Sequence, residues 1–360
     1  MSKPKKTSAL SVQPGVEDTS DLNPNLKGRL KKNILPPPEE LVKGILAGDI
    51  TTLGRAITLI ESTKADHQQL AEKVINACLP HSGNAFRMGI TGIPGVGKSS
   101  FIESFGNYLI GSHRKKVAVL AVDPSSGKNK GSILGDKTRM ERLSQNKHAF
   151  IRPSPSAGSL GGVARKTRET AILCEAAGFN VILIETVGVG QSETAVKSMV
   201  DYFLLLLLPG AGDELQGIKR GIMEMADAIA INKADGDNAK RAEIAKADVN
   251  RALHLYPADA RGWQVPVKTC SALEVFGIDD IWEDALTFER HMKTKGWFDT
   301  NRQEQSAWWL RETITESLIN QFNKKPKVKN RLAQLEEEIK HNRISPFTAA
   351  RELVEIFLNE

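Results

Sequence analysis

The amino-acid sequence predicts an α/β protein built on a mainly parallel β-sheet, and two observations carry this prediction. Six short apolar runs in the middle of the chain are mostly continuous rather than alternating, as strands buried on both faces are. Stretches with helical periodicity separate these runs, which implies right-handed βαβ connections. The six expected strands span residues 87–91, 117–122, 181–184, 202–208, 228–231 and 265–269.

Each expected strand ends in a polar or glycine-rich segment. In chain order these segments read GIPGVGKS, DPSS, ETVGVGQ, PGAGDE, NKAD and CSAL. Ligands of open α/β sheets bind beyond the carboxyl ends of the strands. The sequence therefore predicts one ligand site, formed by loops at a single edge of the sheet.

The chain before the first strand divides into a tail and a helical extension. Residues 1–37 are polar, rich in Lys and Pro and aperiodic, so we expect a disordered tail. A helical period runs from Glu39 to Ile60, weakened by Gly44 and Gly48, and a second helix is expected at about 66–78. Residues 38–85 are therefore expected to form helices packed on a main domain at 86–298.

Residues 299–360 are expected to form a C-terminal helical arm. Four apolar residues follow a spacing of four, and a lysine-rich linker at 323–329 precedes another helix. Ser345 and Pro346 form an N-cap and a first-turn proline, which predicts a last helix. Such an arm docks either on its own domain or on a second subunit. The spaced residues are Leu310, Ile314, Leu318 and Phe322, and the expected apolar face of the last helix is Ala350, Leu353, Val354, Phe357 and Leu358.

Composition argues against two kinds of partner, nucleic acid and membranes. The net charge is +6, but residues 1–35 hold seven Lys/Arg against three acids, so the tail carries +4 of it. The charge imbalance thus belongs to the tail rather than to a basic stripe on the folded part, and we do not expect nucleic acid as a partner. No apolar run approaches the roughly 18 residues of a membrane span, so we expect no membrane partner.

The three cysteines, Cys78, Cys174 and Cys270, are far apart and form no CxxC pair. We therefore expect buried thiols in a reducing cytosol rather than a zinc or redox site. The N-terminus lacks the hydrophobic core of a signal peptide, and its prolines disfavour the amphipathic helix of a transit peptide. The expected location is the cytoplasm, or the mitochondrial matrix if the source is eukaryotic.

The first glycine-rich segment fits the phosphate-binding pattern G-x-x-x-x-G-K-[ST]. Its glycines allow backbone N–H groups to surround phosphate oxygens, and the following helix N-terminus adds positive potential. Lys98 is expected to neutralise the β- and γ-phosphates, and Ser99 to offer a hydroxyl to Mg²⁺. The residues of this P-loop are Gly92, Ile93, Pro94, Gly95, Val96, Gly97, Lys98, Ser99 and Ser100.

The segment Asn232-Lys233-Ala234-Asp235 fits N-K-x-D, which reads guanine. One carboxylate, that of Asp235, accepts both adjacent donors of guanine, whereas adenine leaves it unpaired. Asn232 is expected to hold the loop and the base, and Lys233 to lie along the ring. Backbone N–H groups of Ser271, Ala272 and Leu273 are expected at the guanine carbonyl oxygen. The expected ligands are therefore GTP or GDP with Mg²⁺, and the expected reaction is GTP hydrolysis.

Segments between these motifs are expected to sense the γ-phosphate. Glu185 suits Mg²⁺ or its bound water, and the Gly188 N–H suits the phosphate. Asp123 and Asp136 are further candidate acids for catalysis and for Mg²⁺; alternatively each caps a helix or turn. Val189 stands where Ras-type enzymes have a water-orienting glutamine. Intrinsic hydrolysis is therefore expected to be slow and raised by a partner, with Gln191, Arg139 or Lys219 completing the site.

Taken together, these segments closely resemble the MeaB/ArgK family of P-loop GTPases. The runs that carry the resemblance are GIPGVGKSS, VDPSS, GSILGDKTRM, ETVGVGQSE, GAGDELQGIKRG, NKAD and TCSAL, within about residues 38–360. The resemblance implies a SIMIBI-class G domain with N-terminal helices and a dimerising C-terminal arm. It places Asp123 and Asp136 in switch I and Glu185 in switch II, and it makes 212–219 a further switch that brings Lys219 to the nucleotide.

The resemblance also implies a partner and a role. Family members assist adenosylcobalamin-dependent acyl-CoA mutases, chiefly methylmalonyl-CoA mutase, by gating cofactor loading and protecting the mutase. Two other functions remain open: a nickel metallochaperone GTPase, which would need His-rich or Cys-rich ligands, and the transport ATPase or kinase description attached to ArgK-like sequences.

Overall fold

The computed structural model describes residues 36–122, 140–153, 160–186, 192–210 and 220–359. Contacts between Cα atoms divide the chain into Met1–Pro37 and one compact unit, Pro38–Glu360. The expected tail lies almost entirely outside the described residues, so the architecture below is that of the second unit.

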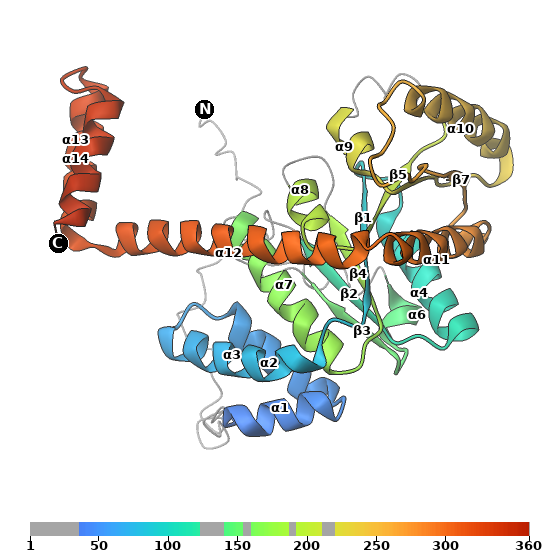
Figure 1. The fold of residues 1–360 in the computed structure, drawn as a ribbon, viewed down its shortest axis with the longest axis horizontal. Helices are drawn as coiled ribbons and strands as arrows, with labels where there is room; N and C mark the ends of the chain where they lie inside the picture. The colour runs from blue at the N-terminus through green and yellow to red at the C-terminus, as the bar shows by residue number, and fades with distance from the viewer. Residues whose placement is uncertain (1–35, 123–139, 154–159, 187–191, 211–219, 360) are drawn as a thin grey trace, which may run out of the picture. The chain divides into compact units, whose positions relative to one another are not determined.

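A seven-stranded sheet, in which all strands run parallel, forms the centre of this unit (Figure 1). The strand order is β3-β2-β4-β1-β5-β6-β7. This confirms the predicted α/β class with its parallel sheet. The strands are β1 (Phe86–Gly92), β2 (Val117–Val122), β3 (Ala149–Arg152), β4 (Val181–Thr186), β5 (Tyr202–Leu207), β6 (Ala228–Ile231) and β7 (Val267–Thr269).

Strand β3 was not among the six expected strands. It pairs with β2 from Val117↔Ala149 to Leu120↔Arg152 and forms one edge of the sheet. Of its four residues, only Ile151 is buried. An edge strand this short does not need a continuous apolar run, and so its sequence resembles that of a loop.

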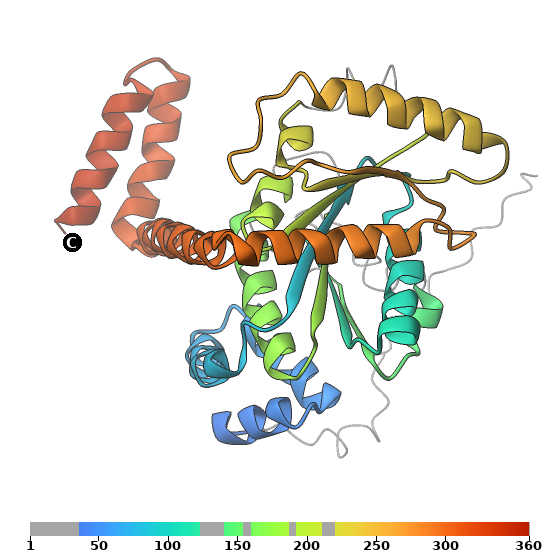
Figure 2. The same ribbon diagram turned by 45° about the vertical axis from the view of Figure 1, so that its right-hand side comes forward.

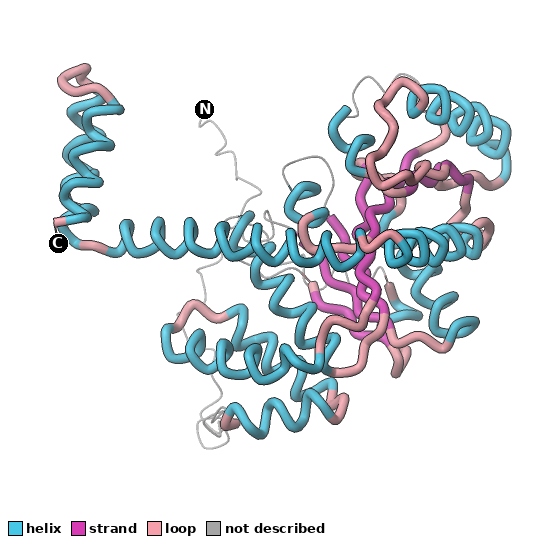
Figure 3. The backbone as a smooth tube through the Cα atoms, in the orientation of Figure 1, coloured by secondary structure: helices cyan, strands magenta, loops and turns pink. Residues whose placement is uncertain are grey.

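Helices cover both faces of the sheet, as Figures 2 and 3 show. In β4, Val181 and Leu183 join the cluster formed with one layer of helices, while Ile182 and Ile184 join the cluster on the other face. This double burial explains why the strand sequences are continuously apolar. One layer consists of α4 (Lys98–His113), α6 (Glu141–Ser144) and α11 (Ile278–Thr294), and the other of α7 (Leu160–Ala176), α8 (Ser192–Lys197), α9 (Arg220–Met225) and α10 (Ala239–Leu253).

Three N-terminal helices pack on α7: α1 (Pro38–Leu46), α2 (Ile50–Glu61) and α3 (Ala65–Cys78). The helical stretch predicted from Glu39 to Ile60 is therefore two helices. Gly48 has a φ of 76°, which ends α1, and Asp49 caps α2 by accepting from the backbone N–H groups of Thr51 and Thr52 at 3.1 Å.

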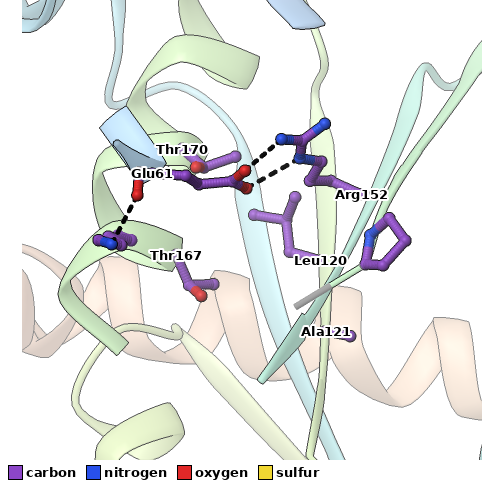
Figure 4. Close-up of a pocket in the computed structure, with 8 residues that line it drawn as sticks. Glu61, Leu120, Ala121, Arg152, Thr167 and Thr170 are labelled. Carbon is purple, nitrogen blue, oxygen red and sulfur yellow. Dashed lines mark hydrogen bonds and ion pairs between the residues drawn. The ribbon is translucent and has the colours of Figure 1, made fainter. Parts of the chain in front are cut away.

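An ion pair joins these helices to the edge of the sheet (Figure 4). Two guanidinium nitrogens of Arg152, in β3, donate to the carboxylate of Glu61 at the end of α2, and the Nε–Oε1 bond measures 2.9 Å. Lys166 of α7 donates to the Glu61 carbonyl oxygen at 2.8 Å. The cavity here measures about 10 Å³, room for about one water molecule. This cluster therefore serves to fasten α2 to β3 and α7.

The C-terminal helices are α12 (Trp297–Lys324), α13 (Pro326–Lys340) and α14 (Pro346–Leu358). The last two lie side by side (Figure 2) around their own core, which includes Val328, Leu335 and Leu353. Two expectations need correction. The predicted linker at 323–329 shrinks to Lys325, because Pro326 begins the next helix directly. The buried residues of α14 are Ala349 and Leu353, whereas Val354 and Leu358 are exposed.

Two smaller predictions concern the cysteines and the last cap. Cys78, Cys174 and Cys270 are free and buried, as expected. Ser345 accepts a hydrogen bond from the Thr348 backbone N–H at 3.1 Å, which confirms its role as N-cap.

Within the described residues, no helix combines the length and the apolar character that a membrane span requires.

Candidate functional site

The candidate site lies where the chain changes direction across the sheet. Strand β1 is central, with β4 on one side and β5 on the other. In doubly wound sheets such a switch point leaves a crevice at the carboxyl ends of the strands. The glycine-rich segment after β1 begins at this point.

The P-loop backbone requires glycine at two positions. Gly97 has a φ of 93°, and a Cβ atom there would lie 2.9 Å from Asn232 Nδ2. A Cβ atom on Gly92 would lie 2.5 Å from the Leu206 carbonyl oxygen. Gly97 is also the N-cap residue of α4, and no side chain caps that helix. The first N–H groups of a 16-residue helix therefore remain available to an anion.

Lys98 lies folded over the loop. Its Nζ donates to the carbonyl oxygens of Gly92 at 2.8 Å and Ile93 at 3.3 Å. Burial lowers the pKa of Lys98, while the charges of Glu185 and Glu193 oppose this effect. A partly desolvated ammonium group interacts more strongly with a phosphate than an exposed one does. This arrangement suits the predicted neutralisation of phosphate charge.

Two of the four predicted magnesium ligands are neighbours. The Ser99 hydroxyl donates to Glu185 Oε1 at 3.1 Å, which brings the start of α4 to the end of β4. Hydroxyl and carboxylate oxygens are the hard ligands that Mg²⁺ prefers, and Mg²⁺ is usually bound by few protein groups. These two residues therefore fit a magnesium ion.

Asn232 joins three segments of the site. Its Nδ2 donates to the Val96 carbonyl oxygen at 2.8 Å, and its Oδ1 accepts from the Ala272 backbone N–H at 3.2 Å. The residue is 1% exposed. The P-loop, the NKAD segment and the CSAL segment, distant in sequence, are thus held as one structure.

Asp235 is positioned by Ser271, whose hydroxyl donates to Asp235 Oδ1 at 2.7 Å. Ser271 is fully buried, and its Oγ also accepts from the Glu274 backbone N–H at 3.1 Å. The carboxylate is therefore fixed in orientation before any base arrives, which is the condition for selective hydrogen bonding.

The remaining predicted nucleotide contacts occupy the same region. Lys233 has a φ of 60° and donates from Nζ to the Gly95 carbonyl oxygen at 2.8 Å, so its chain crosses the P-loop. Leu273 is 84% exposed. Pro94 and Gly95 are exposed within the loop. Ser100 is exposed in the first turn of α4.

Several predicted residues lie outside the described part of the chain. This group comprises Asp123, Asp136, Arg139, Gly188, Val189, Gln191 and Lys219. Their expected roles at the γ-phosphate therefore stay predictions.

The predicted site residues did not include Glu193, and Ser271 was expected to contribute only its backbone N–H group. Glu193, in the first turn of α8, is 1% exposed, and its charge acts on Lys98. A serine and a glutamate in polar segments give no signal of burial, because only the fold closes over them. The Thr186 hydroxyl in β4 also donates a hydrogen bond to the Thr91 hydroxyl in β1 at 2.9 Å, and this contact has no signal in the sequence either.

The chain is similar to known proteins over most of its length. GTPase ArgK of Escherichia coli (strain K12) is 47% identical over 316 residues, which cover 88% of this chain and 95% of that protein. The Mus musculus protein named methylmalonic aciduria type A homolog, mitochondrial, is 42% identical over 329 residues, covering 89% of this chain and 79% of that protein. A crystal structure described as that of an LAO/AO transport system kinase aligns with a TM-score of 0.70 at 40% identity, covering 89% of this chain and 97% of that one.

The model of one protein family covers most of the chain. Its description is methylmalonyl Co-A mutase-associated GTPase MeaB, and it matches residues 53–327. This match confirms both the resemblance drawn from the motifs and the prediction of a P-loop GTPase. The chain therefore belongs to the MeaB family of methylmalonyl Co-A mutase-associated GTPases.

Proposed function

We propose that this protein binds GTP with Mg²⁺, hydrolyses it slowly by itself, and uses the nucleotide to gate adenosylcobalamin loading and protect an acyl-CoA mutase, foremost methylmalonyl-CoA mutase. One observation carries the nucleotide part of the proposal: Asn232 ties the P-loop at Val96 to the segment that holds Asp235. The phosphate-binding and base-reading elements are thereby set at a fixed separation.

Different residues of the chain are proposed to bind the phosphates, the base and the magnesium ion. The N–H groups at the start of α4 and the Lys98 ammonium bind the phosphates, and Asp235 accepts the two guanine donors. Ser99 and Glu185 would hold Mg²⁺, with Asp123 and Asp136 proposed as further ligands. When bound, that ion neutralises charge developing on the phosphate oxygens. Gly188 and Lys219 are proposed to complete the contacts at the γ-phosphate.

Slow intrinsic turnover is supported by the sequence of the ETVGVGQ segment. Val189 has no group to orient a water molecule, so the chain lacks at that position the glutamine of Ras-type enzymes. A partner that repositions another residue would raise the rate. The family description names methylmalonyl Co-A mutase as the associated enzyme, and the name of the mouse relative refers to methylmalonic aciduria.

The solved relative is described as a transport-system kinase, which suggests ATP instead. The Ser271 hydroxyl favours guanine here, because it holds Asp235 as a carboxylate acceptor that adenine cannot satisfy. No observation on the described residues favours a metallochaperone, since they contain no group of three or more His, Cys, Asp or Glu placed to hold a metal.

The test measures hydrolysis of GTP and ATP by the full chain, with and without a purified acyl-CoA mutase from the same cell. We expect slow turnover of GTP alone, faster turnover with mutase, and little turnover of ATP. Equal use of both nucleotides would exclude the guanine assignment. Unchanged GTP turnover together with no complex on size-exclusion chromatography would exclude the mutase as partner.

We further propose that the protein is a homodimer and resides in the cytoplasm, or in the mitochondrial matrix of a eukaryote. The dimer is supported by the exposed apolar residues Leu310, Ile314 and Leu318, 50–63% exposed on α12. Their spacing of four places them on one helix face. Light scattering should give a dimeric mass, and Ile314→Glu with Leu318→Glu should give a folded monomer. A dimeric mass for this double variant would place the interface elsewhere.

A further inference from the structure

A short segment connects the candidate site with the long C-terminal helix α12. This segment, residues 192–201, consists of α8 and the turn into β5, and is called the α8 connector below. At its start, buried Glu193 places a negative charge that acts on Lys98. In its middle, Val196 packs on β1 so closely that a Cβ atom on Gly89 would lie 3.0 Å from Val196 Cγ1. The connector therefore interacts electrostatically with the P-loop lysine and packs against the strand that carries the P-loop.

The other end of the connector is held by α12. Gln305 Nε2 donates to the Val200 carbonyl oxygen at 2.7 Å, and Trp309 Nε1 donates to the Ser198 carbonyl oxygen at 3.0 Å. The Arg302 guanidinium forms two bonds to the Asp201 carboxylate, at 2.8 and 2.7 Å. Arg302, Gln305 and Trp309 recur at helical spacing, so one face of α12 makes all of these contacts.

These contacts are buried and directional. Gln305 is 5% exposed and Trp309 is 6% exposed. A buried hydrogen bond loses its strength over a small displacement, and a carbonyl left without its donor is costly. Arg302 also donates to the carbonyl oxygen of Ala85, just before β1, at 2.7 Å. The helix therefore holds the connector and the start of the P-loop strand in one relative position.

We propose that Arg302, Gln305 and Trp309 are positioning residues of the nucleotide site, which link nucleotide occupancy to the docking of α12 through the α8 connector. The inference rests on the proposed function, because it requires GTP or GDP at the P-loop.

A phosphate that draws Lys98 away from the Gly92 carbonyl oxygen changes how the end of β1 is held. Because Val196 of the connector packs against Gly89 in β1, this change biases the connector. The linkage is reciprocal, so a change in α12 docking alters nucleotide affinity by the same factor.

Hydrogen-deuterium exchange of the full chain tests the link, with a fluorescent GDP used in parallel to measure binding. Adding GDP or a non-hydrolysable GTP analogue should change exchange in peptides covering both 192–201 and 302–312. In Gln305→Met with Trp309→Phe, which remove the two donors while Met keeps the length of Gln and Phe keeps an aromatic ring, the change at 302–312 should be lost. The affinity for GDP in this variant should shift by about fivefold or more.

The matched control carries the same two substitutions on neighbouring positions of α12. Gln303→Met with Trp308→Phe should retain the wild-type response, because neither side chain bonds to the connector in the described structure. If the double variant does not fold, Trp309→Phe alone gives the same reading with a smaller shift. Nucleotide binding without any exchange change at 302–312 in the wild type would overturn the inference but leave the proposed function standing. Absence of nucleotide binding would overturn both.

Discussion

The side-chain amide of Asn232 donates to the carbonyl oxygen of Val96 across 2.8 Å, although 136 positions separate the two residues in sequence. Val96 lies in the P-loop, and Asn232 begins the segment that ends in Asp235. The same amide group accepts from Ala272, so a single side chain fixes three loops. A specific site for a two-part ligand needs this kind of rigid spacing between its parts.

Asn232→Asp is expected to weaken both the fold and the site. The substitution keeps the shape but replaces the donor with a carboxylate that faces the Val96 carbonyl oxygen. Two acceptors then meet in a place that is 1% exposed, at an expected cost of about 1–3 kcal/mol or more. Urea unfolding measures this change. Asn238→Asp is the control, since Asn238 makes no capping bond and should change stability by about 0.5 kcal/mol or less. Equal effects of the two variants would contradict the bridging role.

Asp235→Asn is expected to move preference from guanine to xanthine nucleotides. An amide in place of the carboxylate loses two charge-assisted hydrogen bonds to guanine, so GTP should bind at least about 100-fold more weakly. Xanthine presents a carbonyl oxygen where guanine has its amine, and an amide N–H can pair with it. Competition binding with GTP, XTP and ATP gives the measurement. Unaltered affinity for GTP would show that Asp235 does not read the base.

Ser271→Ala tests how much the orientation of the Asp235 carboxylate contributes to nucleotide binding, because it leaves Asp235 itself unchanged. The hydroxyl contacts Asp235 at 2.7 Å but is itself fully buried, so it acts only through the carboxylate and the Glu274 N–H. Its removal should weaken GTP and GDP equally, by about 5- to 10-fold. If the two affinities change by different factors, the serine acts on the γ-phosphate side of the site instead. Nucleotide titration at constant Mg²⁺ distinguishes these outcomes.

The sequence predicted the central strands well because strands buried on both faces have continuously apolar sequences. Tyr202–Leu207 is buried at every position, and the segment that follows begins with Pro-Gly after Leu208. The edge strand Ala149–Arg152 shows no such pattern, since its pairing with β2 depends on backbone bonds and only one side chain is buried. The break between α1 and α2 depended on Asp49, a single capping residue after Gly48.

The docking of α12 shows more clearly what hydrophobic periodicity in the sequence cannot predict. The apolar stripe that includes Leu310 and Ile314 has the spacing of a buried face, yet both residues are exposed. The helix instead docks through Arg302, Gln305 and Trp309, whose partners are mostly backbone carbonyls. Hydrophobic periodicity cannot indicate such a face, because backbone carbonyls have no sequence signature.

Glu185→Gln is expected to reduce GTP hydrolysis by at least about 100-fold, because loss of a correctly placed metal removes a few kcal/mol of transition-state stabilisation. The amide oxygen of glutamine still accepts the hydrogen bond from Ser99, which measures 3.1 Å, so the fold should persist. Binding of GDP in EDTA is the control and should stay near the wild-type value. Hydrolysis that keeps its Mg²⁺ dependence in this variant would assign the ion to other ligands.

Alkaline pH is expected to destabilise the fold through Cys174. Burial raises the pKa of this fully buried thiol well above its ordinary value of 9.0, and the neighbouring charge of Glu175 acts in the same direction. Above pH 9.0 the unfolded chain releases the thiol proton while the folded chain keeps it. The unfolded state then binds fewer protons, so stability falls as pH rises, by up to about 1.4 kcal/mol per pH unit.

Urea unfolding of the wild type and Cys174→Ala at about pH 7 to 10.5 isolates this contribution, since the cost of the missing sulfur is independent of pH. The wild type should therefore lose stability relative to the variant only above about pH 9, and a constant difference across the range would show that the thiol ionises equally in both states.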